Sequence, residues 1–256
     1  MTRAVRDTFA VFTRELMPTL RSPASLMFTL LQPLVFLALF GPLLAGSVSE
    51  AALGGVNVWQ WFVPGVLVML AVFGSAGTGY TLQLELASGS FERTLVTPLS
   101  RSAIFAGKSL KEMVPLVLQA LLILAVAVPF GLRVQPLAAL AGLAMLGVLG
   151  IGIGALSNAL AISSRNSEWL FWSIQSTLQF PLLILSGMML PLEAAPSWMR
   201  VASNFNPLRY VVDAERALFA GDFGDPAVLR GVIAVVVTCL VGLFVGVRSI
   251  RRTGSR

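Results

Sequence analysis

The chain has no histidine, a single cysteine and few charged residues. Of its 256 residues, 12% are charged and 56% are hydrophobic, which is too apolar for a soluble domain of this size. Cys239 cannot form a disulfide within the chain, and the lack of histidine excludes a Cys/His metal site. The composition therefore indicates an integral membrane protein without redox or zinc chemistry of its own.

A glycine-rich phosphate loop is also missing. Gly107, Lys108 and Ser109 end like such a loop, but Ser102 stands where its first glycine would fall, and no strand precedes it. Any ATP hydrolysis must therefore come from a partner. The net charge of +6 does not indicate nucleic acid, because the basic residues are scattered along loop edges without interleaved aromatic residues.

Long uncharged runs fill most of the chain. A helix needs about 20 apolar residues to cross a bilayer, and the runs bounded by ionisable residues meet this length at 22–49, 51–84, 113–132, 134–164, 169–192 and 231–247. The last run is minimal and needs flanking arginines that reach back to the interface. We therefore expect an all-α integral membrane protein with six transmembrane helices in one domain, 1–256.

The positions of lysine and arginine predict the orientation. With the N-terminus inside, most of the 18 basic residues lie on the cytoplasmic side. The residues left outside are Arg133, Arg200, Arg209, Arg216 and Arg230. Both termini are therefore expected in the cytoplasm of a multi-pass protein of the cell membrane.

Two shorter helical patterns lie outside the spans. Residues 1–22 place Val5, Phe9, Phe12 and Leu16 at helical spacing, which favours an amphipathic helix on the inner leaflet. The long outer segment 191–226 carries two stretches too short to cross the membrane. We expect these to form short re-entrant-like helices between the fifth and sixth spans, with their turns covered by protein.

The segment 81–112 is the polar interruption between the second and third spans. Its glutamates alternate with basic residues, at Glu85, Glu92 and Glu112 and at Arg93, Arg101, Lys108 and Lys111. Gly89 and Pro98 bracket one or two helical turns that place Phe91 and Leu95 on one face. We interpret the segment as a cytoplasmic docking and coupling loop, with an ordinary solvated loop as the open alternative.

Polar residues form a stripe in the fifth run. Trp172, Gln175 and Gln179 share a helical face with Glu168, and Ser176 lies beside them. Such groups are costly in lipid, so the face should meet protein or water. A transport path or subunit seam and simple hydrogen bonding between helices both remain open.

Four stretches resemble one family in order along nearly the whole chain. ELASGSFERTLVTPLSRSAIFAGKSL at 85–110 resembles the first cytoplasmic loop of ABC-2 type permeases, the membrane subunits of ATP-binding cassette exporters such as the daunorubicin-resistance permeases. RSPASL at 21–26, FVPGVLVM at 62–69 and NPLRYVVDAERALFAG at 206–221 are similar to the family's first-span entry, second-span signature and outer-loop motif.

The resemblance implies a permease that works as a pair, with a second copy or a related permease, beside separate ABC ATPase subunits. ATP and Mg would be bound by that partner, and no cofactor by this chain. The cargo would be a drug, lipid or glycan. The residues expected to couple to the ATPase are Ser90, Phe91, Glu92, Arg93 and Leu95, and those of the outer motif that would help close the exit are Asn206, Pro207, Arg209 and Asp213.

Two other functional classes of membrane protein are less well supported by the sequence. A stand-alone secondary transporter or channel would need charged residues in the spans or repeated halves with broken helices, and the sequence shows neither. A membrane-embedded enzyme would need histidine, paired carboxylates or an activated nucleophile. The first of these is the alternative to an ATP-driven exporter.

Overall fold

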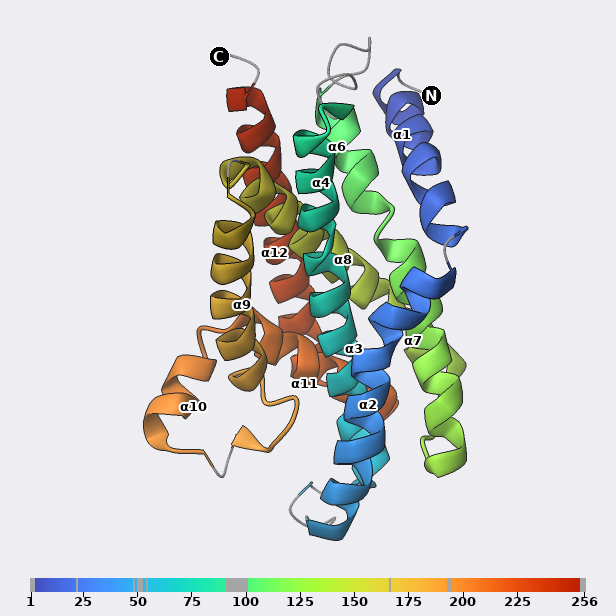
Figure 1. The fold of residues 1–256 in the computed structure, drawn as a ribbon. Helices are drawn as coiled ribbons and strands as arrows, with labels where there is room; N and C mark the ends of the chain where they lie inside the picture. Colours follow the sequence, from blue (N-terminus) through green and yellow to red (C-terminus); the bar gives the residue numbers. More distant parts are fainter. Residues whose placement is uncertain are drawn as a thin grey trace.

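The computed structural model describes residues 3–21, 23–47, 49, 53, 55–90, 101–165, 167–192 and 195–253, and all regular elements in these ranges are helical (Figure 1). The helices are α1 (Arg3–Leu20), α2 (Pro23–Ser47), α3 (Val58–Ala76), α4 (Thr78–Ala87), α6 (Arg101–Leu110), α7 (Met113–Ala127), the 3-10 turn η2 (Val128–Phe130), α8 (Pro136–Ser163), α9 (Glu168–Ile184), α10 (Ser197–Ser203), α11 (Pro207–Phe219) and α12 (Pro226–Thr253).

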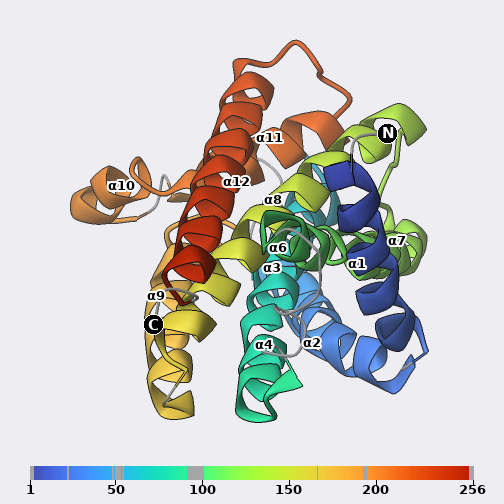
Figure 2. The same cartoon turned by 90° about the horizontal axis from the view of Figure 1, so that it is seen from above.

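Helix α3 forms the centre of the bundle. Its residues Phe62, Val63 and Leu67 are completely buried, and the helix is apolar on all sides, as expected for a helix surrounded by others. Viewed from above, α8 passes close to α3, with α2 and α7 on one side and α9 and α12 on the other (Figure 2). The hydrophobic core follows α3 and the faces of α2, α7, α8 and α11 that meet it.

Within the part of the chain that the structure describes, five helical stretches are long and apolar enough to cross a membrane. They are Leu30–Ser47, Val58–Ala87, Ala106–Phe130, Pro136–Ser163 and Pro226–Ser249. Helix α9 has 17 residues and is shorter than these. By length and composition these five stretches are candidate membrane spans, and a sixth crossing by α9 stays a prediction.

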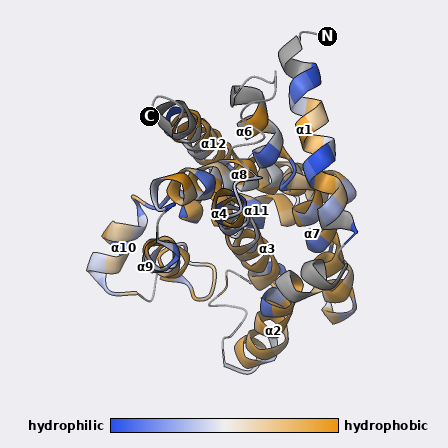
Figure 3. Cartoon of the chain, turned by 45° about the horizontal axis from the view of Figure 1, so that its top comes forward, coloured by the Kyte–Doolittle hydropathy of each residue, from blue (hydrophilic) through white to orange (hydrophobic). Residues whose placement is uncertain are grey.

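Apolar side chains cover the outside of this bundle. In Figure 3 the hydrophobic colour dominates α2, α3 and α7, whereas α1 alternates between polar and apolar residues. Helix α12 exposes Leu240 and Phe244 by more than 60% of their surface. In water such a surface would be unstable, whereas in a bilayer it faces lipid.

Glycines allow α8 and α12 to cross at van der Waals contact. A methyl group on Gly242 would overlap the carbonyl of Gly152, and one on Gly152 would lie 2.8 Å from the Cα of Cys239. Small residues let membrane helices approach closely where hydrophobic driving force between them is weak. The backbones of α8 and α12 therefore touch at this crossing.

Two short helices, α10 and α11, lie within the segment 191–226, and α11 is more deeply placed than α10. Val211, Val212 and Ala214 of α11 are completely buried, and the helix packs on α12, α3 and α8. Figure 1 shows α10 and α11 toward the end of the bundle opposite the start of α1 and the end of α12.

Candidate functional site

Helix α1 crosses α6 at a glycine. A methyl group on Gly107 would lie 2.8 Å from the Cβ of Val11 and 2.9 Å from the carbonyl oxygen of Thr8. Val11 is 4% exposed, whereas Phe9 is 61% exposed. The apolar face of α1 is thus divided, with Val11 packed on α6 and Phe9 turned away from the bundle.

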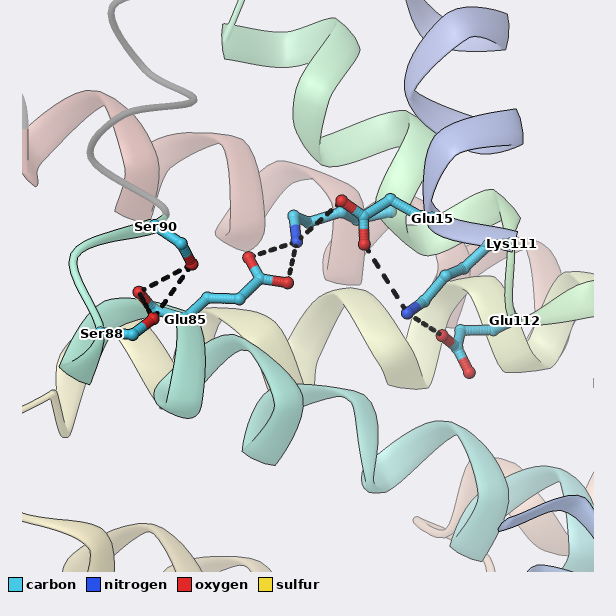
Figure 4. Close-up of polar contacts among 7 residues, drawn as sticks. Glu15, Glu85, Ser88, Ser90, Lys111 and Glu112 are labelled. Carbon is cyan, nitrogen blue, oxygen red and sulfur yellow. Dashed lines mark hydrogen bonds and ion pairs between the residues drawn. The ribbon is translucent and has the colours of Figure 1, made fainter. Parts of the chain in front are cut away.

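Beside this crossing lies an ion-pair cluster of Glu15, Glu85, Lys108, Lys111 and Glu112 (Figure 4). The Nζ of Lys108 lies 2.5 Å from Oε2 and 2.6 Å from Oε1 of Glu85, and 3.4 Å from Oε1 of Glu15. The Nζ of Lys111 lies 3.9 Å from Oε2 of Glu15 and 3.7 Å from Oε1 of Glu112. The cluster joins α1, α4, α6 and the start of α7.

The cluster is largely shielded from water. The side chain of Lys108 is 7% exposed and that of Glu85 is 24% exposed. In such surroundings the charges depend on one another, because removing one partner leaves an uncompensated charge and costs about 3 to 5 kcal/mol. A displacement of α1 or α4 should therefore shift α6 and α7 as well.

The segment that the sequence predicts as a coupling loop starts directly next to the cluster. Helix α4 ends at Ala87 and Gly89 has φ of 68°, so the helix stops where the sequence predicted. The hydroxyls of Ser88 and Ser90 donate to the main-chain carbonyl of Glu85. The predicted residues Phe91, Glu92, Arg93 and Leu95 lie outside the described residues.

Hydrogen bonds join α4 to α8 below the cluster. The Nε2 of Gln83 donates to the carbonyl and the hydroxyl of Ser164 at 3.2 and 3.1 Å. The hydroxyl of Ser157 accepts from the backbone N–H of Gly79 at 3.2 Å and donates to the carbonyl of Ala76. These bonds attach the break between α3 and α4 to a neighbouring helix.

The polar stripe of α9 is divided between protein and the outer surface. Gln179 is buried, and Gln175 lies 3.1 Å from the hydroxyl of Ser157. Ser176 is exposed and donates to the carbonyl of Trp172 in its own helix, and the indole of Trp172 packs on Tyr80. The structure thus brings Gln175 to α8, buries Gln179, and leaves Trp172 and Ser176 on the surface.

The predicted outer motif starts and anchors α11. Asn206 accepts from the N–H of Leu208 as an N-cap and donates to the carbonyl of Leu182 at 2.6 Å, at the end of α9, and Pro207 occupies the first turn. Arg209 donates to the hydroxyl of Ser203 at 2.9 Å. The Nε of Arg209 lies 3.8 Å from Oδ2 of Asp213, as the i, i+4 spacing indicated.

Two further anchors of α11 were not identified from the sequence. Arg216 donates to the carbonyls of Trp61 at 3.1 Å and Gly187 at 2.9 Å, with its guanidinium over the ring of Trp61. Gln60 donates to the carbonyls of Phe219 and Arg133 at 2.5 and 3.0 Å, and accepts from the N–H of Arg133. These contacts fix α11 to α3 and to the turn before α8.

The sequence held only a partial signal for these contacts. Lys108, Lys111 and Glu112 belong to the alternating charges of 81–112, but Glu15 lies far from them in the chain.

Among the described residues, no group of three or more His, Cys, Asp or Glu is arranged to hold a metal. The site can thus hold helices in register and pass movement between them.

These features define a multi-pass helical membrane protein whose polar contacts join its helices at both ends. The chain belongs to the ABC-2 type transporter family, whose model matches residues 6–220. It is 31% identical over 218 residues to the transport permease ycf38 of Cyanophora paradoxa, covering 84% of this chain and 75% of that protein. It is 26% identical over 243 residues to the daunorubicin resistance ABC transporter permease protein DrrB1 of Streptomyces coeruleorubidus, covering 94% and 84%.

Proposed function

We propose that this chain is the membrane-spanning subunit of an ATP-driven exporter that moves a drug, lipid or glycan out across the cell membrane. Family membership supports a permease subunit of an ABC transporter. The name of the Streptomyces relative supports a drug-type cargo. Outward transport, the cargo and the six-span topology with both termini in the cytoplasm are parts of this proposal.

The observation that carries the proposal is the ion-pair cluster around Lys108. It joins α4, which precedes the segment 91–100, to α6, which follows it, and it includes Glu15 of α1. A force applied to this loop or to α1 would reach the cluster first. From there it would pass into α7 through Lys111 and Glu112, and into α8 through Gln83.

The partner that applies this force is a separate ABC ATPase, which binds ATP and Mg. We propose that its docking surface includes Phe91 and Leu95, which the sequence predicts on one face of a helical turn, together with helix α1. Phe9 at 61% and Met17 at 50% exposure give α1 an apolar surface that the membrane or the ATPase covers.

At the other end, α11 closes the exit. Asn206 and Arg216 link it to the end of α9 and the turn that follows, through the carbonyls of Leu182 and Gly187. A second copy or a related permease completes the transporter. The exposed side of α9, with Trp172 and Ser176, is the proposed seam or pathway surface. A movement of α9 would in this way reach the outer closure.

The test is to purify the chain with an affinity tag from its native membrane in mild detergent and to measure ATP hydrolysis before and after stripping bound subunits. We expect activity only while a subunit with its own phosphate-binding loop is bound. Sustained hydrolysis by the stripped chain would contradict the proposal. Transport that needs no ATPase and follows an ion gradient would favour a secondary transporter instead.

A further inference from the structure

Glu215 is a buried acid for which the proposed transport mechanism has no role. Its side chain on α11 is fully buried, and within the part of the chain that the structure describes neither carboxyl oxygen has a hydrogen-bond partner. It lies against Gly142 of α8, where an added methyl group would come within 2.5 Å of Oε2. Only a residue without a side chain leaves space for this carboxyl group.

The helices packed against α11 supply no countercharge. Helices α3 and α8 contain no titratable side chain between Val58 and Ala76 or between Pro136 and Ser163. On α12, Arg230 is exposed, and Cys239 lies against Gly152, about 15 Å along α8 from Gly142.

The charged groups of α11 itself are directed elsewhere. Asp213 forms ion pairs with Arg209 and Arg216, and Arg216 donates to the carbonyls of Trp61 and Gly187. The hydroxyl of Tyr210 donates to the carbonyl of Asn204. Glu215 is thus surrounded by apolar groups, and burial raises its pKa from an ordinary 4.5 to about 8.

An ionised carboxylate at this position would be buried without a partner, which is very costly. The packed arrangement of α11 therefore favours the neutral acid. We propose that Glu215 is a proton-binding site that controls how firmly α11 is seated on α8. When the proton is lost, arrangements in which α11 moves away from Gly142 and the carboxylate meets water are favoured.

The direction of the pH effect follows from the two states. In the seated state Glu215 keeps its proton up to about pH 8, whereas an acid in water loses it near its ordinary value. We call the arrangement in which α11 has moved away from Gly142 the open state. Between these two pH values the seated state binds a proton that the open state does not. Raising the pH therefore shifts the balance toward the open state by up to tenfold per pH unit, and the shift ends above pH 8. The inference concerns this chain alone and does not depend on export.

The test measures access to the seam between α11 and α8. Leu218 is one turn from Glu215 and 2% exposed, so a cysteine there is protected while α11 is seated. Leu218→Cys is placed in a Cys239→Ser chain, with either Glu215 or Glu215→Gln, and a water-soluble maleimide is added to the purified full chain between pH 5.5 and 8.5. At each pH, the labelling rate of the chain with Glu215 is divided by that of the Glu215→Gln chain. This ratio cancels the titration of the thiol.

We expect this ratio to rise at least tenfold across the range. Asp222→Asn, a change at an exposed acid just beyond the end of α11, should leave the rise in place. Glu215→Met, which also lacks the titrating group, serves as a second reference. Dividing by its labelling rate should give the same rise, which covers the case in which the Glu215→Gln variant folds poorly. A ratio that stays constant with pH against both replacements would overturn the proposal.

Discussion

Lys108 and Glu85 stand on opposite sides of the segment 91–100, and their side chains meet, with Nζ 2.5 and 2.6 Å from the two carboxylate oxygens. An ion pair therefore joins the two helices, α4 and α6, that flank this segment. Because Glu15 lies 3.4 Å from the same Nζ, α1 is tied to this ion pair as well.

Removing the central cation should destabilise the protein. Lys108→Met leaves Glu85 and Glu15 without their shared partner in a poorly hydrated place, so we expect a loss of about 3 kcal/mol in the free energy of unfolding. Thermal unfolding in detergent, followed by tryptophan fluorescence, measures the change.

Lys111→Met is the matched control, because its ion-pair distances of 3.7 and 3.9 Å indicate a weaker interaction and a smaller loss. Combining Lys108→Met with Glu85→Gln should cost clearly less than the sum of the two single changes. Strict additivity would show that the pair does not act as a unit.

The crossing of α8 and α12 gives a second prediction. Gly242→Ala should lower stability by about 1 to 3 kcal/mol, because the new methyl group overlaps the carbonyl of Gly152. Gly74→Ala in α3 is the control, since no atom lies within 4 Å of its added carbon, and it should be neutral or stabilising. Equal losses in the two variants, measured by the same unfolding assay, would argue against the crossing.

The topology gives a third prediction, which follows from the positive-inside distribution. In a Cys239→Ser chain, cysteines at Thr2 and Ser255 should be protected from an impermeant thiol reagent in intact cells, whereas a cysteine at the exposed Asp222 should react. Permeabilised cells serve as the control, in which all three should react. Labelling of either terminus in intact cells would reverse the orientation.

The sequence predicted the helices better than their contacts. Apolar length identified the five candidate membrane-crossing stretches, and Gly89 indicated where α4 ends, because these signals are local. The end of α9 at Ile184 was not anticipated, since the uncharged run continues to Leu192 and only the turn at Gly187, with φ of 72°, interrupts it.

Contacts between distant segments were beyond the sequence pattern. Glu15 and Lys108 lie far apart in the chain, and nothing in either local sequence shows that they meet. Glu215 reaches the interior because α11 packs against α3, α8 and α12. Because Glu215 lies in a segment that the sequence places outside the spans, its burial could not be predicted from the sequence.

The central claim is that this chain transmits work from a separate ATPase through the loop between α4 and α6. Phe91 and Leu95, placed on one face by their spacing, would each contribute about 1.5 to 3 kcal/mol to docking by burial, whereas exposed ion pairs of Glu92 and Arg93 would contribute at most about 1 kcal/mol.

The most direct measurement is the amount and activity of ATPase that co-purifies with the tagged chain. Phe91→Ala combined with Leu95→Ala should lower the bound ATPase at least tenfold, or leave hydrolysis without transport, at unchanged membrane abundance. Glu92→Ala combined with Arg93→Ala is the matched control and should have a smaller effect. Normal ATPase association together with normal coupled transport in the Phe91 and Leu95 variant would contradict the claim.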